Sequence, residues 1–112
     1  MKRLPAIFFR TPAGREPVRE WLKALEIADR RIVGADIATA EFAWPIGMPK
    51  CRAMGQGLFE IRSNLSTGRI ARVMFGVTED RMVLLHGFIK KSQKTPKTDF
   101  DLALARWKET KR

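Results

Sequence analysis

The sequence predicts a single α+β domain in which an antiparallel sheet carries two N-terminal helices and a C-terminal helix. Apolar residues recur at helical spacing over residues 16–44 and 96–110, whereas residues 57–89 form three short runs of strand-like residues. Short connections between these runs are typical of an antiparallel meander. With 112 residues, 45 % of them hydrophobic, the chain can build one core but not two. We therefore expect one domain spanning residues 1–112, with the helices packed on one face of the sheet.

The N-terminal part of the chain predicts one strand and two helices. A strand is expected over residues 4–10 and a turn at residues 11–14. Pro17 suits a first helical position, because the amide that proline lacks would be unpaired there. The apolar stripe of this helix consists of Val18, Trp21, Leu22 and Leu25. A second helix is expected from Asp29 to Phe42, and its buried face consists of Val33, Ile37, Ala40 and Trp44.

The second half of the chain predicts the sheet and the last helix. Residues 50–57 are expected to form a basic loop that contains glycine, and the sheet is expected to begin at Gly57. Alternation in the next two strands, residues 57–62 and 69–77, places Arg62 and Arg72 opposite the main run of large hydrophobic side chains. The last strand is expected at about residues 81–89. Thr95 and Pro96 then resemble the N-cap and first position of a helix that ends near Thr110.

The few cysteine and histidine residues exclude several classes of protein. Cys51 is the single cysteine, which rules out a disulfide framework and fits a reducing cytoplasm. With only Cys51 and His86 available, no zinc site is expected, and the sequence suggests no cofactor. The apolar run at the N-terminus stops at Arg10, too early for a signal peptide, and no stretch is long enough to span a membrane. We expect a cytoplasmic protein.

Positive charge is concentrated in the predicted sheet. Residues 50–97 carry ten basic and three acidic residues, and therefore +7 of the net charge of +10. A basic face on a small domain favours phosphate, and hence nucleic acid, as its partner. A charge that serves only solubility, or an acidic protein partner, is the alternative.

Arginines and lysines are the main candidates for a functional site. Arg62 and Arg72 each interrupt an apolar strand pattern, and Lys90, Lys91 and Lys94 follow at the end of the last strand. The arginine fork suits phosphate because it makes two hydrogen bonds and does not deprotonate. A solvated sheet face would also carry charges, but the convergence of five basic residues favours a phosphate site. We expect both arginines on an open face, so that the loss of Arg72 costs only about 0.5 kcal/mol in stability.

His86 is the second kind of candidate. It could act as a general acid or base, but Leu84 and Phe88 are expected on its own face, so a packed histidine is the favoured interpretation. The predicted RNA-binding set is completed by basic residues around the sheet: Lys50, Arg52, Arg69 and Lys94.

Three segments resemble the phage-derived, HigB-like branch of the RelE toxin superfamily. They are Leu58-Phe-Glu-Ile-Arg62, Arg69-Ile-Ala-Arg72-Val-Met-Phe75 and Leu84-Leu-His-Gly-Phe-Ile-Lys-Lys-Ser-Gln-Lys-Thr-Pro96. The glycine, phenylalanine, paired lysines and Thr-Pro of the last segment, in that order, are the specific part. The resemblance covers residues 57–107 closely and the two N-terminal helices loosely.

The resemblance implies a RelE-like fold and a toxin of a type II toxin–antitoxin system. Such a toxin cleaves mRNA on the translating ribosome as a metal-independent endoribonuclease and is neutralised by a cognate helix-turn-helix antitoxin. By position, Arg62 and Arg72 match the strand arginines of the family, and Lys90 or Lys91 matches the basic residue that ends the last strand. Relatives use a tyrosine near the C-terminus, but this chain has none. His86 or a lysine would then accept the proton, or the reaction would depend on positioning and charge.

The expected reaction follows from these residues. The 2′-hydroxyl of the RNA attacks the adjacent phosphate, Arg62 and Arg72 hold that phosphate, and Lys90 and Lys91 assist the leaving group or position the backbone. The alternative is a non-catalytic RNA-binding or phage regulatory protein that uses the same basic face. A catalyst would lose activity through one arginine while binding survives, whereas a binder would lose affinity gradually with each charge.

Overall fold

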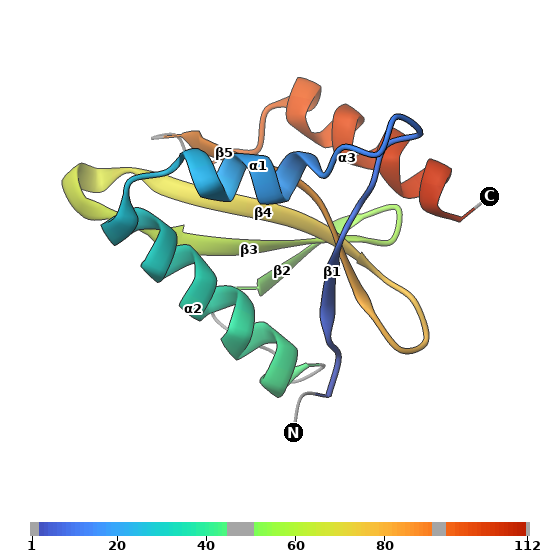
Figure 1. Cartoon of the computed structure of the whole chain (residues 1–112), viewed down its shortest axis with the longest axis horizontal. Helices are drawn as coiled ribbons and strands as arrows, with labels where there is room; N and C mark the ends of the chain where they lie inside the picture. Colours follow the sequence, from blue (N-terminus) through green and yellow to red (C-terminus); the bar gives the residue numbers. More distant parts are fainter. Residues whose placement is uncertain (1–2, 45–50, 91–93, 112) are drawn as a thin grey trace.

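The computed structural model describes residues 3–44, 51–90 and 94–111, and it confirms the α+β class (Figure 1). Its elements in chain order are β1 (Ala6–Phe8), α1 (Pro17–Ala24), α2 (Ile27–Ala43), β2 (Cys51–Gly55), β3 (Leu58–Asn64), the short 3-10 helix η1 (Ser66–Gly68), β4 (Ile70–Val77), β5 (Met82–Lys90) and α3 (Lys97–Thr110). None of the helices in these ranges combines the length and the apolar character that crossing a membrane requires.

Five strands form one sheet in the order β1-β5-β4-β3-β2. The strands β2 to β5 are an antiparallel meander, whereas β1 joins the edge of β5 in parallel, with Ala6 opposite Met82. The expectation of a loop over residues 50–57 is wrong for Cys51–Gly55, which is strand β2. The strand forms because a tight turn follows it. Gly55, Gln56 and Gly57 all have positive φ, and this turn brings the chain back as β3, which pairs with β2.

The helices cover both faces of the sheet, so the expectation that they share one face is wrong. Val73 and Phe75 of β4 belong to the core cluster that contains Val18 of α1 and Val33 of α2. Their neighbour Met74 points to the other face and packs in the cluster of α3, the core side chains of which are Ala103 and Trp107. Apolar residues on both sides of β4 therefore require cover on both sides. The helices α1 and α2 lie on one side of the sheet and α3 on the other (Figure 1).

A β-bulge in β5 redirects the side chains that follow it. Phe75 pairs with Leu84, but Met74 pairs with His86, so Leu85 is an extra residue without a counterpart. Leu84 packs with α1 and α2, whereas Leu85 packs with α3. Arg106 of α3 donates a hydrogen bond of 2.8 Å to the carbonyl oxygen of Leu85. This bond satisfies a backbone group at the irregularity, because a buried carbonyl without a partner would be costly.

A pair of glycine substitutions tests this packing. A Cβ at Gly87 would lie 2.4 Å from Trp21 Cε3, whereas a Cβ at Gly34 in α2 would meet nothing within 4 Å. We expect Gly87→Ala to lower the free energy of unfolding by about 1–3 kcal/mol through overpacking. Gly34→Ala should raise it by about 0.5–1 kcal/mol through helix propensity. Urea denaturation of both variants measures the difference, and a Gly87→Ala variant as stable as Gly34→Ala would contradict the close approach of α1 to β5.

Candidate nucleic-acid interface

Strand register gathers three arginines on the face of the sheet that α3 covers in part. Arg52 of β2 lies opposite Glu60 of β3, and Arg62 of β3 lies directly opposite Arg72 of β4. We call Arg52, Arg62 and Arg72 the arginine cluster. The sequence pattern placed Arg62 and Arg72 correctly on one face, but β2 adds Arg52 beside them.

A buried carboxylate lies within the arginine cluster. Glu60 is 0 % exposed. Its Oε1 lies 3.5 Å from Arg52 Nη2, and its Oε2 accepts a hydrogen bond of 2.5 Å from the hydroxyl of Thr95. The same hydroxyl accepts a bond of 3.3 Å from Arg72 Nη1. The expectation that Thr95 is the N-cap of α3 is wrong. Pro96 occupies that position, and no side-chain hydrogen bond among the described residues caps the helix.

Arg72 is fully buried, which corrects the expectation that it stands on an open face. Its exposed fraction is 0 %, and it is the largest fully buried side chain in the described ranges. Burial lowers the pKa of the Arg72 guanidinium, Glu60 opposes that shift, and the charges of Arg62 and Arg52 add to it. Arginine still remains charged at neutral pH. Arg72 thus lies beneath the surface of the arginine cluster, whereas Arg52 and Arg62 are the members that solvent reaches.

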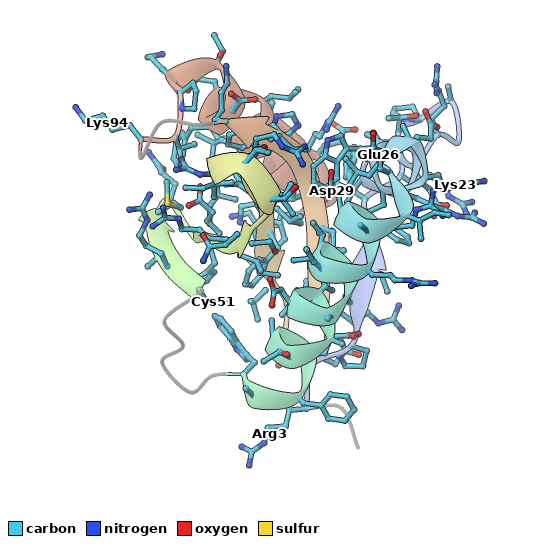
Figure 2. All side chains as sticks on the ribbon, turned by 90° about the vertical axis from the view of Figure 1, so that its left-hand side faces the viewer. Arg3, Lys23, Glu26, Asp29, Cys51 and Lys94 are labelled. Atoms are coloured by element: carbon cyan, nitrogen blue, oxygen red, sulfur yellow. The ribbon has the colours of Figure 1, made fainter. Side chains whose placement is uncertain are left out.

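Accessible positive charge comes from residues around Arg72. The side chain of Arg52 is 46 % exposed, Arg62 is partly exposed, and Lys90 and Lys94 are exposed. Lys90 ends β5 opposite Ile70, which places it on the same face as Arg72 by strand alternation. Lys94 lies on the side of the molecule away from Lys23 and Asp29, as Figure 2 shows. Two predicted site residues, Lys50 and Lys91, lie outside the described residues.

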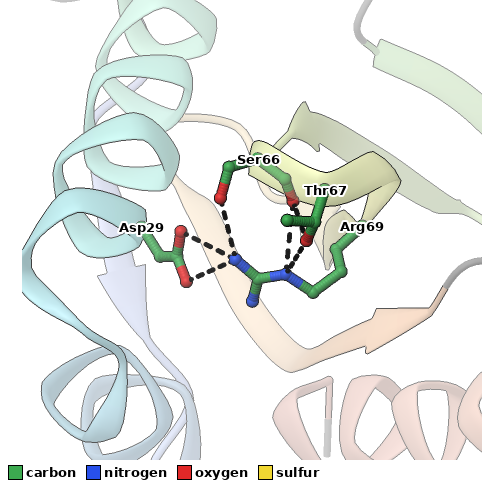
Figure 3. A network of polar contacts seen from close by, with 4 residues as sticks. All are labelled: Asp29, Ser66, Thr67 and Arg69. Carbon is green, nitrogen blue, oxygen red and sulfur yellow. Dashed lines mark hydrogen bonds and ion pairs between the residues drawn. The ribbon is translucent and has the colours of Figure 1, made fainter.

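Arg69 is not brought together with the arginine cluster. Its Nη2 lies 3.1 Å from Asp29 Oδ2 at the start of α2, and its Nε donates to the carbonyl oxygen of Ser66 and to Thr67 Oγ1 (Figure 3). Asp29 is buried. Arg69 therefore ties the β3–β4 connection to α2. The sequence left its direction open, and the ion pair with Asp29 gives it a structural role.

His86 is oriented by an acidic residue that sequence reasoning missed. Its Nε2 lies 2.6 Å from Asp99 Oδ1 in the first turn of α3, and its ring stacks on Phe88 with centroids 5.3 Å apart. The expectation that Leu84 shares this face is wrong, because the bulge at Leu85 turns Leu84 toward α1 and α2. His86 pairs with Met74 in the strand register and not with an arginine.

Two other kinds of site, a reactive cysteine and a metal centre, are not indicated by the described residues. Burial, and secondarily the charge of Asp36, raises the pKa of the Cys51 thiol to about 11, so it stays protonated at neutral pH. In residues 3–44, 51–90 and 94–111, no three histidine, cysteine or carboxylate side chains gather as they would around a metal ion. The charged groups that the arginine cluster, Lys90 and Lys94 offer are guanidinium and ammonium groups, which are chemically suited to anions.

Glu60 and Asp99 are polar residues that the sequence did not single out, and Thr95 was singled out only as a helix N-cap. The alternation of β3 already placed Glu60 on the same face as Arg62, and this pattern could have indicated that Glu60 belongs to the site. Thr95 and Asp99 are far away in the sequence, and only the return of α3 over the sheet brings them to Glu60 and His86.

The comparison with known families finds a match over most of the chain. No curated protein matches the chain. The family described as "Phage derived protein Gp49-like (DUF891)" matches residues 20–108, which include α2, the strands β2 to β5 and most of α3. The match thus covers the whole arginine cluster together with Glu60 and Thr95. The chain belongs to the Gp49-like family of phage-derived proteins.

Proposed function

We propose that this protein is the toxin of a type II toxin–antitoxin system, a ribosome-dependent endoribonuclease of the HigB-like branch of the RelE superfamily. Three supports converge on it: membership of the Gp49-like family, the α+β fold with its five-stranded sheet, and the resemblance of residues 57–107 to those toxins.

The single observation that carries the proposal is the arginine pair across β3 and β4. Arg62 and Arg72 are directly opposite each other, and like charges in that position destabilise a sheet. Arg52 is next to them, and Glu60 is the one carboxylate among the residues that the register and the contacts described above bring to this cluster. Binding of an anion between these arginines would reduce the repulsion and so stabilise the fold. RNA supplies such an anion in its phosphate groups.

The proposed reaction uses the substrate as its own nucleophile. The ribose 2′-hydroxyl attacks the neighbouring phosphorus, the bond to the 5′-oxygen breaks, and a 2′,3′-cyclic phosphate and a 5′-hydroxyl result. Arg62 and Arg52 stabilise the charge that grows on the phosphate oxygens, and Lys90 and Lys94 hold the flanking backbone. Because Asp99 occupies His86 Nε2, the proton of the 2′-hydroxyl passes to solvent water and water protonates the leaving 5′-oxygen. We therefore assign the rate enhancement to positioning and charge.

The partners of the proposed toxin are mRNA on the ribosome and a helix-turn-helix antitoxin. The basic excess of residues 50–97 suits both partners. An antitoxin that covers Arg62 and Lys90 with acidic side chains would neutralise the toxin by occupying the phosphate site.

Growth arrest tests the proposal in cells. We expect expression of the chain alone to stop bacterial growth, and Arg62→Gln to relieve the arrest, because a partly exposed phosphate contact at the centre of the arginine cluster is lost. Arg81→Gln is the matched control: it removes the same charge from an exposed side chain that pairs with Asp80, outside the arginine cluster. Colony counts after induction, at equal protein levels by immunoblot, give the result. Full toxicity of Arg62→Gln would contradict the assignment of this face.

A further inference from the structure

We infer that Glu60 and Thr95 are positioning residues, which hold Arg72 and Arg52 in the arrangement that cleavage requires without touching the RNA. This inference rests on the proposed function, because it concerns the same site. It assigns a role to the buried acidic residue at the centre of a basic surface.

Burial excludes Glu60 from direct contact with the substrate. Its side chain is 0 % exposed, and each carboxylate oxygen already faces a protein partner: Arg52 Nη2 at 3.5 Å and Thr95 Oγ1 at 2.5 Å. A general base must reach the proton that it removes. Glu60 instead acts on the groups that surround it.

The hydroxyl of Thr95 connects three segments that are distant in the sequence. It donates its only proton to Glu60 of β3 and accepts a bond of 3.3 Å from Arg72 Nη1 of β4, while its own backbone leads into α3. Because the hydroxyl proton is committed to the carboxylate, a lone pair is oriented toward the guanidinium. The carboxylate therefore sets the direction in which Arg72 is held.

Charge gives Glu60 its second effect. Arg62 and Arg52 each disfavour the charged form of Arg72, and Glu60 favours it. Without the carboxylate, the three guanidinium groups repel one another and move apart. Loss of Glu60 would raise the positive charge of the face and still impair its geometry. Binding and cleavage should then respond in opposite directions.

The Glu60→Gln variant tests this opposition. We expect its affinity for a single-stranded RNA oligonucleotide to equal or exceed that of the wild type, while cleavage of mRNA on ribosomes falls at least about tenfold, because small displacements of catalytic groups are costly. Glu79→Gln, an exposed residue of the β4–β5 turn, changes the net charge equally. It should bind slightly tighter and cleave normally. A folded Glu60→Gln that cleaves at the wild-type rate overturns the inference.

Substitutions of Thr95 supply a milder test that does not depend on cleavage. Thr95→Ser keeps the hydroxyl group. Thr95→Val keeps the shape of the side chain but removes the hydroxyl group. In ¹⁵N NMR spectra of the full chain, the guanidinium N–H signals of Arg72 should persist in the wild type and in Thr95→Ser and broaden in Thr95→Val. If the wild type cleaves no RNA, the proposed function fails, and these signals alone decide whether Glu60 and Thr95 position Arg72. Unchanged signals in Thr95→Val overturn the inference.

Discussion

Replacing Arg72 with alanine is expected to lower the free energy of unfolding by roughly 3–5 kcal/mol, the usual cost of breaking a buried charge pair. Arg72 is 0 % exposed, as is Glu60, and the charge of Glu60 favours the charged form of Arg72. The substitution also removes the partner that donates to Thr95. A change this large would consume much of the stability of a domain of this size. Arg72 variants are therefore expected to lose function through unfolding.

Urea denaturation followed by circular dichroism measures this effect. Arg81→Ala serves as the control and should stay within about 0.5 kcal/mol of the wild type, as exposed substitutions usually do. The double variant Glu60→Leu with Arg72→Met should recover much of the loss, because it leaves no buried charge without a partner. An Arg72→Ala protein with wild-type stability would show that the guanidinium is not buried in solution.

Replacing Arg62 with glutamine is expected to lower the rate of RNA cleavage by about 10²-fold or more, the usual effect of removing one group that stabilises the transition-state charge. Arg62 is partly exposed and lies directly opposite Arg72. Its loss should leave the fold intact and reduce the salt dependence of RNA binding by only about one phosphate contact. Rate and affinity should thus separate.

Single-turnover cleavage assays and equilibrium binding on the same RNA, for Arg62→Gln and its control Arg81→Gln, make this comparison. Parallel, modest losses in both quantities would contradict catalysis. They would instead support the alternative, a non-catalytic RNA-binding or phage regulatory protein.

Periodicity alone predicted most of the elements of the fold. The stripe of Val18, Trp21, Leu22 and Leu25 contributes to the core as expected, and the parity of Arg62 and Arg72 is correct. The three-layer arrangement was missed because alternation shows which residues share a face but does not show what covers it. Both faces of β4 are apolar at Val73 and Met74, and this was the available signal.

The errors at the site have local physical causes. An arginine in a strand is usually solvated, and for this reason Arg72 was expected on an open face. Its burial depends on polar contacts with Thr95 and, through Thr95, with Glu60. A strand pattern does not reveal such contacts. The bulge at Leu85 breaks the period of two, and this is why His86 and Leu84 lie on different faces. The glycines of residues 50–57 favoured a loop in the sequence analysis, yet Gly55 and Gly57 form the tight turn of a hairpin.

A substrate with one 2′-deoxynucleotide tests the central claim most directly. In the proposed reaction, the nucleophile belongs to the ribose on the 5′ side of the cut. RNA that lacks this one hydroxyl should bind with unchanged affinity and remain intact on the ribosome. The all-ribose substrate should be cut even in the presence of EDTA, at a concentration that leaves ribosomes assembled, and yield a 2′,3′-cyclic or 3′-phosphate end. Cleavage of the deoxy substrate at the normal rate would contradict the account.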